Sequence, residues 1–167
     1  VANLVLNGNW YMKNKYNFKY VPSGIRHICL YMHKTHPLFN VNPDTLSVRD
    51  FANDTFFIFA PFEPDYENGP TCKFLLENGI TPKVKLFETL DSYIMMMETG
   101  QGVTISSNHL SLTTSRDFHK VYIDEIPAHE EAFAWHPQNL NPSINMFVNF
   151  VRKYTSQNGV RFDPYYP

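Results

Sequence analysis

The sequence predicts an α/β protein in which short strands alternate with helices and pair largely in parallel. Two apolar, β-prone runs at 27–32 and 55–60 are typical of buried strands. Helix start and stop signals surround the segments 70–78 and 89–98. The chain has 167 residues, 43% of them hydrophobic and 18% charged, so it can bury a domain-sized core and is not disordered as a whole.

The first forty residues predict two strands and two turns. The apolar residues 2–6 form one strand, which Asn7-Gly8-Asn9 ends. Pro22-Ser23-Gly24 predicts a turn, and residues 27–32 form the buried strand that follows it. Residues 10–20 mix aromatic side chains with Lys and Asn, and this pattern indicates no single structure.

The next segment predicts a short helix and a second buried strand. Residues 46–51 can form one or two helical turns, with Thr45 or Ser47 as the N-cap. The run 55–60 then forms a strand, which Pro61 ends because proline has no N–H for a strand ladder.

Two helices and the strand between them follow. Residues 70–78 begin with a proline, which suits the first helical position, and Gly79 comes just after their end. Residues 83–87 alternate between polar and apolar, as a strand does. Residues 89–98 form the second helix, which ends at Gly100.

The C-terminal third predicts further strands and a final helix. Three short strands are expected, at 103–105, 121–123 and 132–135. The last helix has Asn141 as its N-cap and Pro142 at its first position. Its apolar residues fall on one face: Ile144, Phe147, Val148 and Val151. From Gly159 onward the tail has no periodicity.

Charge and cysteine content exclude several classes of protein. The net charge is −2 and the pI about 6.4, so no basic footprint for a nucleic acid or an anionic membrane is present. No apolar run approaches the ~20 residues that a membrane helix needs. Cys29 and Cys72 are expected to be reduced and buried, and we expect neither a cofactor nor a metal.

The catalytic and metal motifs that can be tried on the sequence fail. His33 and His36 lack an acidic or thiolate residue at ligand spacing, and His129-Glu130-Glu131 lacks the second histidine of a zinc protease motif. Gly100-Gln101-Gly102 follows a helix, whereas a dinucleotide fingerprint follows a strand. A catalytic triad could be posed from Ser106, Ser107, His109 and Asp117, but their spacing does not demand one. The sequence therefore does not predict an enzyme.

The junction at 87–89 is the best candidate for a ligand site. A strand ends there and a helix begins, and ligands of α/β sheets collect at the carboxyl ends of strands, near the free N–H groups of helix N-termini. Thr89 is either a simple N-cap or a cap that also faces a ligand, and the local sequence leaves both open.

The order of these motifs resembles the effector-binding domain of LysR-type transcriptional regulators. The segment 88–108, ETLDSYIMMMETGQGVTISSN, is similar to the family's most recognisable stretch. Upstream, HICLYMHKTHPL at 27–38 and LSVRDFANDTFFIFA at 46–60 resemble the preceding strands, and 121–126 and 131–150 resemble the return strands and last helix. The resemblance covers about 2–154.

The resemblance implies the type 2 periplasmic-binding-protein-like fold, with two Rossmann-like α/β lobes and a small molecule in the cleft between them. It implies the end of the first lobe and a hinge at 1–9, a second lobe at 10–122, a return to the first lobe at 123–156 and a tail at 157–167. The first lobe is then incomplete, and we expect the chain to be a fragment without the family's N-terminal winged helix-turn-helix.

By this resemblance the chain is a cytoplasmic effector sensor of a bacterial regulator, which contacts DNA only through the missing domain, contacts no membrane and is not an enzyme. The expected effector contacts are Asn7, Asn9, Pro61, Phe62, Thr89, Leu90 and Ser92. Self-association as a dimer or tetramer is expected through the helix at 70–78, with Cys72, Phe74 and Leu75 in the interface. One departure is Ser106-Ser107, where many relatives carry Leu-Pro.

The residues around Thr89 also predict the charge of the effector. Glu88 and Asp91 lie in the same turn, and no Arg or Lys stands at the expected contact positions. We therefore expect a neutral or weakly polar effector, aromatic in view of Phe62 and Trp10. The alternatives are a solute-binding protein or an enzyme on the same fold, or a module that only dimerises.

Overall fold

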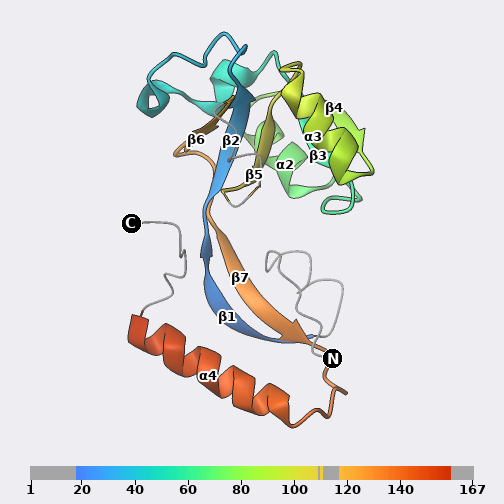
Figure 1. Ribbon diagram of the computed structural model, residues 1–167, viewed down its shortest axis with the longest axis vertical. Coiled ribbons are helices and arrows are strands. Elements are labelled where there is room, and N and C mark those ends of the chain that lie inside the picture. Colours follow the sequence, from blue (N-terminus) through green and yellow to red (C-terminus); the bar gives the residue numbers. More distant parts are fainter. Residues whose placement is uncertain (1–17, 109, 111–116, 159–167) are drawn as a thin grey trace. The chain divides into compact units, whose positions relative to one another are not determined.

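The computed structural model describes residues 18–108, 110 and 117–158, and these form two compact units (Figure 1). Unit 1 comprises the chain up to His27 and from Ala128 onward, and unit 2 runs from Ile28 to Pro127. These limits differ from the expected lobe boundaries at 10 and 122, because residues 19–26 pair with the C-terminal part of the chain. The expected strand at 2–6, with the turn at 7–9, lies outside the described residues.

The described part of unit 1 contains an antiparallel strand pair and one helix, α4 (Ser143–Asn158). The strands are β1 (Lys19–Arg26) and β7 (His129–Trp135). The turn predicted at Pro22-Ser23-Gly24 is wrong, because this tripeptide lies inside β1. The pairing register shifts between Pro22 and Gly24, and such a bulge is where a strand accommodates a proline.

The core of unit 1 forms between α4 and the strand pair. The buried face of α4 is Ile144, Val148 and Val151, which pack with Val21 of β1. The helical stripe is thus confirmed at three positions, whereas Phe147 is largely exposed and touches only the edge of the Phe133 ring, with the centroids 4.9 Å apart. Asn141 caps the helix as predicted, since its side-chain oxygen accepts the Ser143 N–H at 2.9 Å.

Unit 2 is built on a mixed sheet. Its strands are β2 (Ile28–His33), β3 (Thr55–Phe59), β4 (Lys83–Phe87), β5 (Thr104–Ser107) and β6 (Phe118–Val121). β3 and β4 pair in parallel, and a parallel bridge between Phe56 and Val103 joins them to β5. β2 pairs antiparallel with both β5 and β6.

The prediction of largely parallel pairing is therefore wrong. It holds only where a helix crosses between neighbouring strands, from β3 to β4 and on to Val103. β2 and β6 lie outside these crossovers, and the described residues of their connections to the rest of the sheet carry no α-helix. A periodicity of two identifies a strand but carries no information on its direction.

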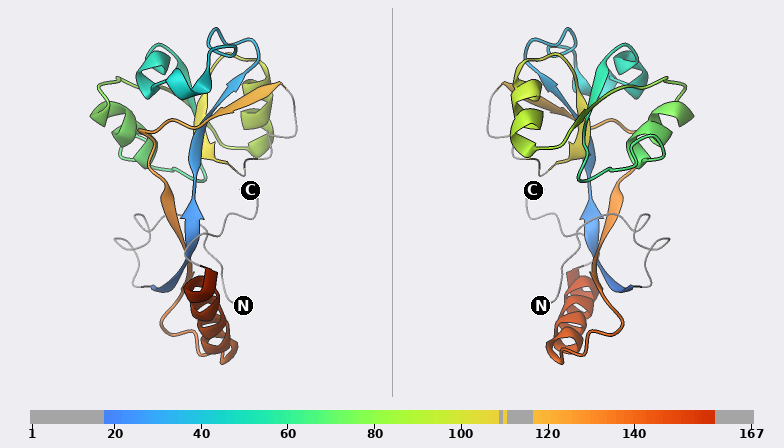
Figure 2. Two further views of the ribbon diagram at one scale, coloured as in Figure 1. Left: turned by 90° about the vertical axis from the view of Figure 1, so that its left-hand side faces the viewer. Right: turned by 90° about the vertical axis from the view of Figure 1, so that its right-hand side faces the viewer.

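The helices of unit 2 lie close to where the sequence predicts them. The α-helices are α2 (Pro70–Glu77) and α3 (Leu90–Glu98), which lie on opposite faces of the sheet (Figure 2). Gly79 and Gly100 follow them with φ of 78° and 67°, the left-handed conformation expected for these glycines. The segment 46–51 is a 3-10 turn, η2 (Val48–Phe51), after a first turn η1 (Pro43–Thr45), and Ser47 caps η2.

Two separate cores cover the two faces of the unit 2 sheet. On the α2 side, alternate residues of β2 such as Leu30 and Met32 pack with Phe56 and Leu75. On the α3 side, the core comprises Cys29, Tyr31, Phe57, Phe87, Tyr93 and Met97. Both cysteines are free and buried, as predicted, and burial raises the pKa of Cys29 to about 11.

The remaining strands are shifted from their predicted positions. The strand predicted at 121–123 lies earlier in the chain. β6 ends at Val121, so only the first residue of the predicted strand belongs to it. β6 begins with the sequence Phe-His-Lys. Its polar residues are tolerated because, among the described strands, β6 pairs with β2 alone and so lies at the edge of the sheet. β7 contains the predicted strand at 132–135 but starts three residues earlier, and β5 is displaced by one residue at its start.

Gly102 and Gly79 provide a test of the tight entry into β5. A Cβ at Gly102 would lie 2.5 Å from the Thr55 carbonyl oxygen, whereas one at Gly79 meets nothing within 4 Å. We predict that Gly102→Ala lowers the free energy of unfolding by about 3 kcal/mol, because β3 and β5 must move apart. Gly79→Ala should cost only about 1 kcal/mol, the backbone penalty of a positive φ. Urea denaturation of both variants checks this, and equal costs would contradict it.

Candidate functional site

The carboxyl ends of β3 and β4 bring the predicted contact residues together. The strands end side by side with Phe59 opposite Phe87, and the Ala60 N–H donates to the Phe87 carbonyl at 2.9 Å. The segments that follow, 60–63 and 88–92, therefore start next to each other. We call these two segments the β3–β4 edge.

Five of the seven predicted effector contacts lie at the β3–β4 edge: Pro61, Phe62, Thr89, Leu90 and Ser92. The other two, Asn7 and Asn9, lie outside the described residues, as does Trp10. The grouping follows from parallel pairing alone, because parallel strands place their carboxyl ends at the same edge of the sheet.

The aromatic ring of Phe62 is exposed to solvent at this edge. The Phe62 side chain is 68% exposed, and its ring meets the Phe59 ring edge-on, with centroids 5.0 Å apart and an interplanar angle of 89°. Phe59 in turn lies 5.8 Å from the Tyr93 ring, and Phe87 lies 5.9 Å from it. Phe62 is thus the outermost ring of a connected aromatic group, and its edge-to-face contact orients it.

Sequence reasoning missed the three rings that support Phe62. The sequence pattern predicts Phe59 and Phe87 only as strand residues and Tyr93 only as a helix residue. The available signal was that both parallel strands end in phenylalanine, which places two rings at one edge once the pairing is known.

Thr89 is the N-cap of α3. Its hydroxyl oxygen accepts the Ser92 N–H at 3.3 Å and lies 2.8 Å from the Ser92 hydroxyl, which donates to the Thr89 carbonyl at 2.9 Å. The cap, which both interpretations of Thr89 share, is therefore observed. Its side chain and that of Leu90 remain exposed.

The start of α2 is capped from a distance by Glu63. The N-cap residue, Gly69, has no side chain, and Pro70 has no N–H, so the helix lacks a local cap. One Glu63 carboxylate oxygen accepts the Thr71 N–H at 2.8 Å, and the other accepts the Thr71 hydroxyl at 2.8 Å. Burial raises the pKa of Glu63, although both hydrogen bonds act in the opposite direction.

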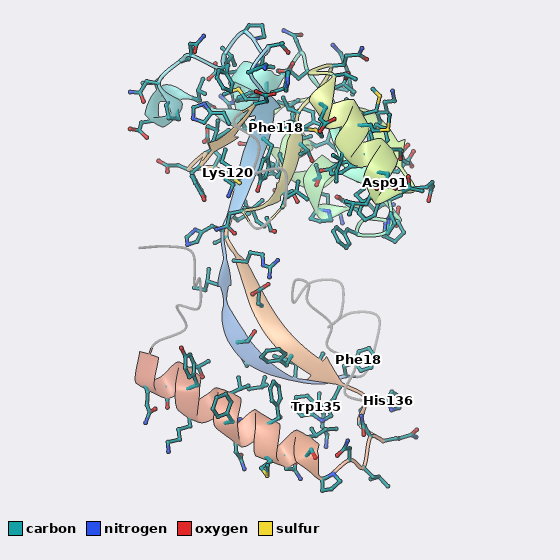
Figure 3. All side chains as sticks on the ribbon, viewed as in Figure 1. Phe18, Asp91, Phe118, Lys120, Trp135 and His136 are labelled. Carbon is teal, nitrogen blue, oxygen red and sulfur yellow. The ribbon has the colours of Figure 1, made fainter. Side chains whose placement is uncertain are left out.

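The loops that form this edge are acidic. Residues 60–71 and 87–92 contain Glu63, Asp65, Glu67, Glu88 and Asp91 and no Lys, Arg or His. Asp91, in the first turn of α3, is exposed (Figure 3). These two segments therefore disfavour an anion, even though a helix N-terminus by itself favours one. A cation lies beside them, because Lys85 Nζ of β4 is 5.6 Å from the centroid of the Phe87 ring.

A buried hydrogen-bond chain holds α3 against the sheet. The Tyr93 hydroxyl donates to the Thr104 hydroxyl oxygen at 2.7 Å, and Thr104 donates to the Phe57 carbonyl at 2.9 Å. Burial raises the pKa of Tyr93 to about 12, so the phenol is neutral at physiological pH. The chain connects α3, β5 and β3, the three elements that position the β3–β4 edge.

The architecture is shared with solved structures of bacterial regulators, although no protein-family model and no curated protein matches the sequence. The effector-binding domain of QuiR, in complex with shikimate, has a TM-score of 0.71 at 17% identity, over 88% of this chain and 69% of that chain. The regulatory domain of CcmR from Synechocystis PCC6803, in complex with 2-PG, has a TM-score of 0.69 at 15% identity, over 91% and 73%. Full-length BenM has a TM-score of 0.67 at 13% identity, over 92% and 52%.

The chain has the LysR effector-binding fold. The expected type 2 periplasmic-binding-protein-like architecture is thereby confirmed. The chain spans about half the length of full-length regulators of this fold, 52% of BenM and 54% of the putative LysR family regulator from Pseudomonas aeruginosa. Within the described residues, no helix is both long and apolar enough to cross a membrane.

In this LysR effector-binding fold, the His-Pro-Leu segment is structural. The Leu38 N–H donates to His36 Nδ1 at 3.2 Å, so Nε2 carries the proton that it donates to Asp54, 3.1 Å away. The His36 ring also stacks on Phe51 at 5.5 Å. Both ring nitrogens are occupied, and no group of metal-ligating side chains occurs among the described residues.

The residues that could be posed as a triad have other partners where the structure describes them. Asp117 forms an ion pair with Lys34 at 2.9 Å, and His109 lies outside the described part of the chain. Ser107, at the end of β5, accepts the Tyr31 hydroxyl at its carbonyl at 2.7 Å.

Burial limits which side chains of α2 are available for self-association. Cys72 and Leu75 lie buried within the chain, so they cannot supply surface to a second copy. Phe74 is partly buried against the same core, whereas Leu76 is 55% exposed. The expectation of an interface on this helix therefore depends on Leu76 and part of Phe74, because the buried face points to the sheet.

The Tyr93–Thr104 chain yields a paired prediction. Tyr93→Phe removes one donor but leaves Thr104 bonded to Phe57, so we expect a loss of about 1 kcal/mol in unfolding free energy. Thr104→Val leaves the buried Tyr93 hydroxyl and the Phe57 carbonyl without this partner, and should cost about 2–3 kcal/mol.

Urea unfolding of both single variants and of the double variant measures these costs. The double variant should be more stable than Thr104→Val alone, because it removes the orphaned hydroxyl. Strict additivity of the two single costs would contradict the proposed chain.

Proposed function

We propose that the chain is the effector-sensing part of a LysR-type transcriptional regulator and that it binds a small molecule at the β3–β4 edge. Solved structures of the same fold contain shikimate, 2-PG or benzoate, which supports a sensor of small molecules. In this proposal the chain is not an enzyme, works in the cytoplasm and reaches DNA through a winged helix-turn-helix elsewhere in a longer protein.

The exposed ring of Phe62 carries the proposal. An aromatic side chain that is 68% exposed gains nothing from burial in the folded chain, yet its contact with Phe59 holds its orientation. A planar ligand can cover the open face of such a ring without reorganising it. The hydroxyl oxygens of Thr89 and Ser92, at the same edge, can accept neutral hydrogen bonds, since both hydroxyl protons are used within the cap.

The effector in this proposal is neutral and planar. Shikimate and benzoate are carboxylates, and capture of a carboxylate commonly uses a bidentate Arg. The segments 60–63 and 88–92 of the β3–β4 edge carry three acidic residues and no basic one. These carboxylates outnumber the adjoining Lys85, whose Nζ lies 5.6 Å from the Phe87 ring centroid, so a carboxylate is disfavoured there in this proposal. An uncharged aromatic compound avoids that cost and still gains the stacking contact.

Transmission in this proposal is a population shift. The effector must bind more tightly to one arrangement of the regulator than to another, and it can shift the balance only by that difference. A tenfold difference in affinity corresponds to about 1.4 kcal/mol, which is within the usual range for allosteric coupling.

A thermal-shift panel tests the proposed ligand class. We expect benzamide and other neutral aromatic compounds to raise Tm, by about 5–10 °C at a hundredfold excess over Kd. Phe62→Ala should abolish the shift because the ring is the contact surface, and Leu76→Ala, an exposed leucine on α2, should leave it intact. Stabilisation by dicarboxylates or sulfate that Thr89→Val abolishes, with no response to neutral aromatics, would contradict the proposal.

Self-association is a separate prediction. Sedimentation at about 100 µM should show a dimer. The two-fold interface of such a dimer should bury more than about 1,000 Å² in total, as stable interfaces do. Leu76→Glu should shift the population toward monomer by placing a charge on the exposed face of α2, whereas Val41→Glu, at another exposed apolar position, should not. A strict monomer at this concentration would contradict it.

A further inference from the structure

The loop that carries Phe62 is fastened to α2 by the next side chain. Phe62 and Glu63 are neighbours, and their N–H groups donate to the Phe59 and Ala60 carbonyls at 3.0 and 3.1 Å. These two bonds form a tight turn at the end of β3. The Glu63 carboxylate then reaches across to Thr71 with both oxygens, at 2.8 Å each.

We infer that Glu63 is a positioning residue, whose clamp on Thr71 fixes the turn at 60–63 and so holds the Phe62 ring in place. The link to effector binding rests on the proposed function of Phe62. The clamp itself follows from the contacts of Glu63 and can be tested without any effector.

The geometry distinguishes the clamp from an ordinary helix cap. An ordinary cap comes from the residue just before the helix, and here that residue is a glycine. The carboxylate instead comes from a position eight residues before Thr71, across the intervening loop at 64–68. The contact therefore joins the end of β3 to the start of α2, and it constrains both.

Gly69 leaves space for this contact. It is buried, and a Cβ there would collide with the Glu63 side chain, including its Oε1. The φ of Gly69 is −74°, which any residue can adopt, so the missing side chain serves the packing and not the backbone conformation. The start of α2 thus has a recess that the Glu63 side chain fills.

The strength of the clamp comes from its charge and from its two-point attachment. A carboxylate that accepts a backbone N–H at a helix N-terminus gains from the helix dipole, and a charge-assisted hydrogen bond is stronger than a neutral one. Two acceptor atoms on one rigid group also restrict rotation of the Glu63 side chain. Because Glu63 follows Phe62 directly, that restriction passes to the backbone of the turn.

Amide hydrogen exchange on the 167-residue chain tests the clamp, with Glu63→Ala as the main variant and NMR as the readout. We expect exchange at the amides of residues 62 and 63 to rise about tenfold, which corresponds to about 1.4 kcal/mol. The amide of Phe57, which donates to Val103 within the sheet, should be unchanged. Glu63→Gln keeps the shape and can still accept the Thr71 N–H, so it should restore most of the protection.

Glu67→Ala is the matched control, since Glu67 is an exposed carboxylate of the same loop that accepts the neighbouring Tyr66 hydroxyl at 3.1 Å. It should leave exchange at residues 62 and 63 unchanged. Thr71→Val removes the hydroxyl but keeps the N–H, and should give a smaller increase at the same two amides.

The inference is overturned if Glu63→Ala accelerates exchange only in the first turn of α2, at Lys73, and leaves residue 62 protected, because Glu63 would then be a cap alone. Equal acceleration in Glu67→Ala would overturn it as well. If Glu63→Ala does not fold, an unchanged residue 62 amide in Thr71→Val is the overturning result. None of these outcomes depends on the identity of an effector, so they are separate from a failure of the ligand panel.

Discussion

The parallel pairing of β3 with β4 is the constraint on which the candidate site depends. Phe59 lies opposite Phe87, and from this register both chains leave the sheet at the same edge. The bridge from Phe56 to Val103 continues the same parallel order toward β5. Each of these steps contains a helical crossover, and the helices consequently begin at the edge where the strands end. A one-residue slip of β4 would turn its side chains to the opposite face and separate Phe87 from the Tyr93 ring.

The edge combines two opposing tendencies. Helix N-termini favour negative charge, and both α2 and α3 start near this edge. In α2, the chain's own carboxylate, from Glu63, meets that need. In α3, the hydroxyl oxygen of Thr89 accepts the Ser92 N–H instead. The segments 60–71 and 87–92 contain five acidic residues and no basic one, and for this reason the proposed effector is neutral although ligands of other proteins with this fold include carboxylates.

The two units differ in how completely their described parts bury apolar surface. Unit 2 has a core on each face of its sheet. In the described part of unit 1, four buried side chains form the core between α4 and one strand pair, and Met146 and Phe150 on α4 remain exposed. A two-stranded ribbon gains little stability by itself, so α4 contributes most of the burial there. The Phe18 ring adds an edge-on contact with His136, at 6.0 Å, visible in Figure 3.

Local chemistry was enough to determine the helices, the buried strands and the chain order of the motifs. Proline at the first position of α2 and glycine after each of the two α-helices of unit 2 act within one turn, and their effects are readable from neighbouring residues. The shared position of the expected contact residues at one edge likewise follows from strand ends and helix starts. These residues are Pro61, Phe62, Thr89, Leu90 and Ser92. Strand direction was not readable, because a strand's side-chain pattern is the same whichever way it runs; antiparallel β2, β5 and β6 therefore had to come from the structure. The strand through Pro22-Ser23-Gly24 and the Glu63–Thr71 clamp also required it, since a ladder partner more than a hundred residues away and a cap from across a loop depend on which segments meet in space.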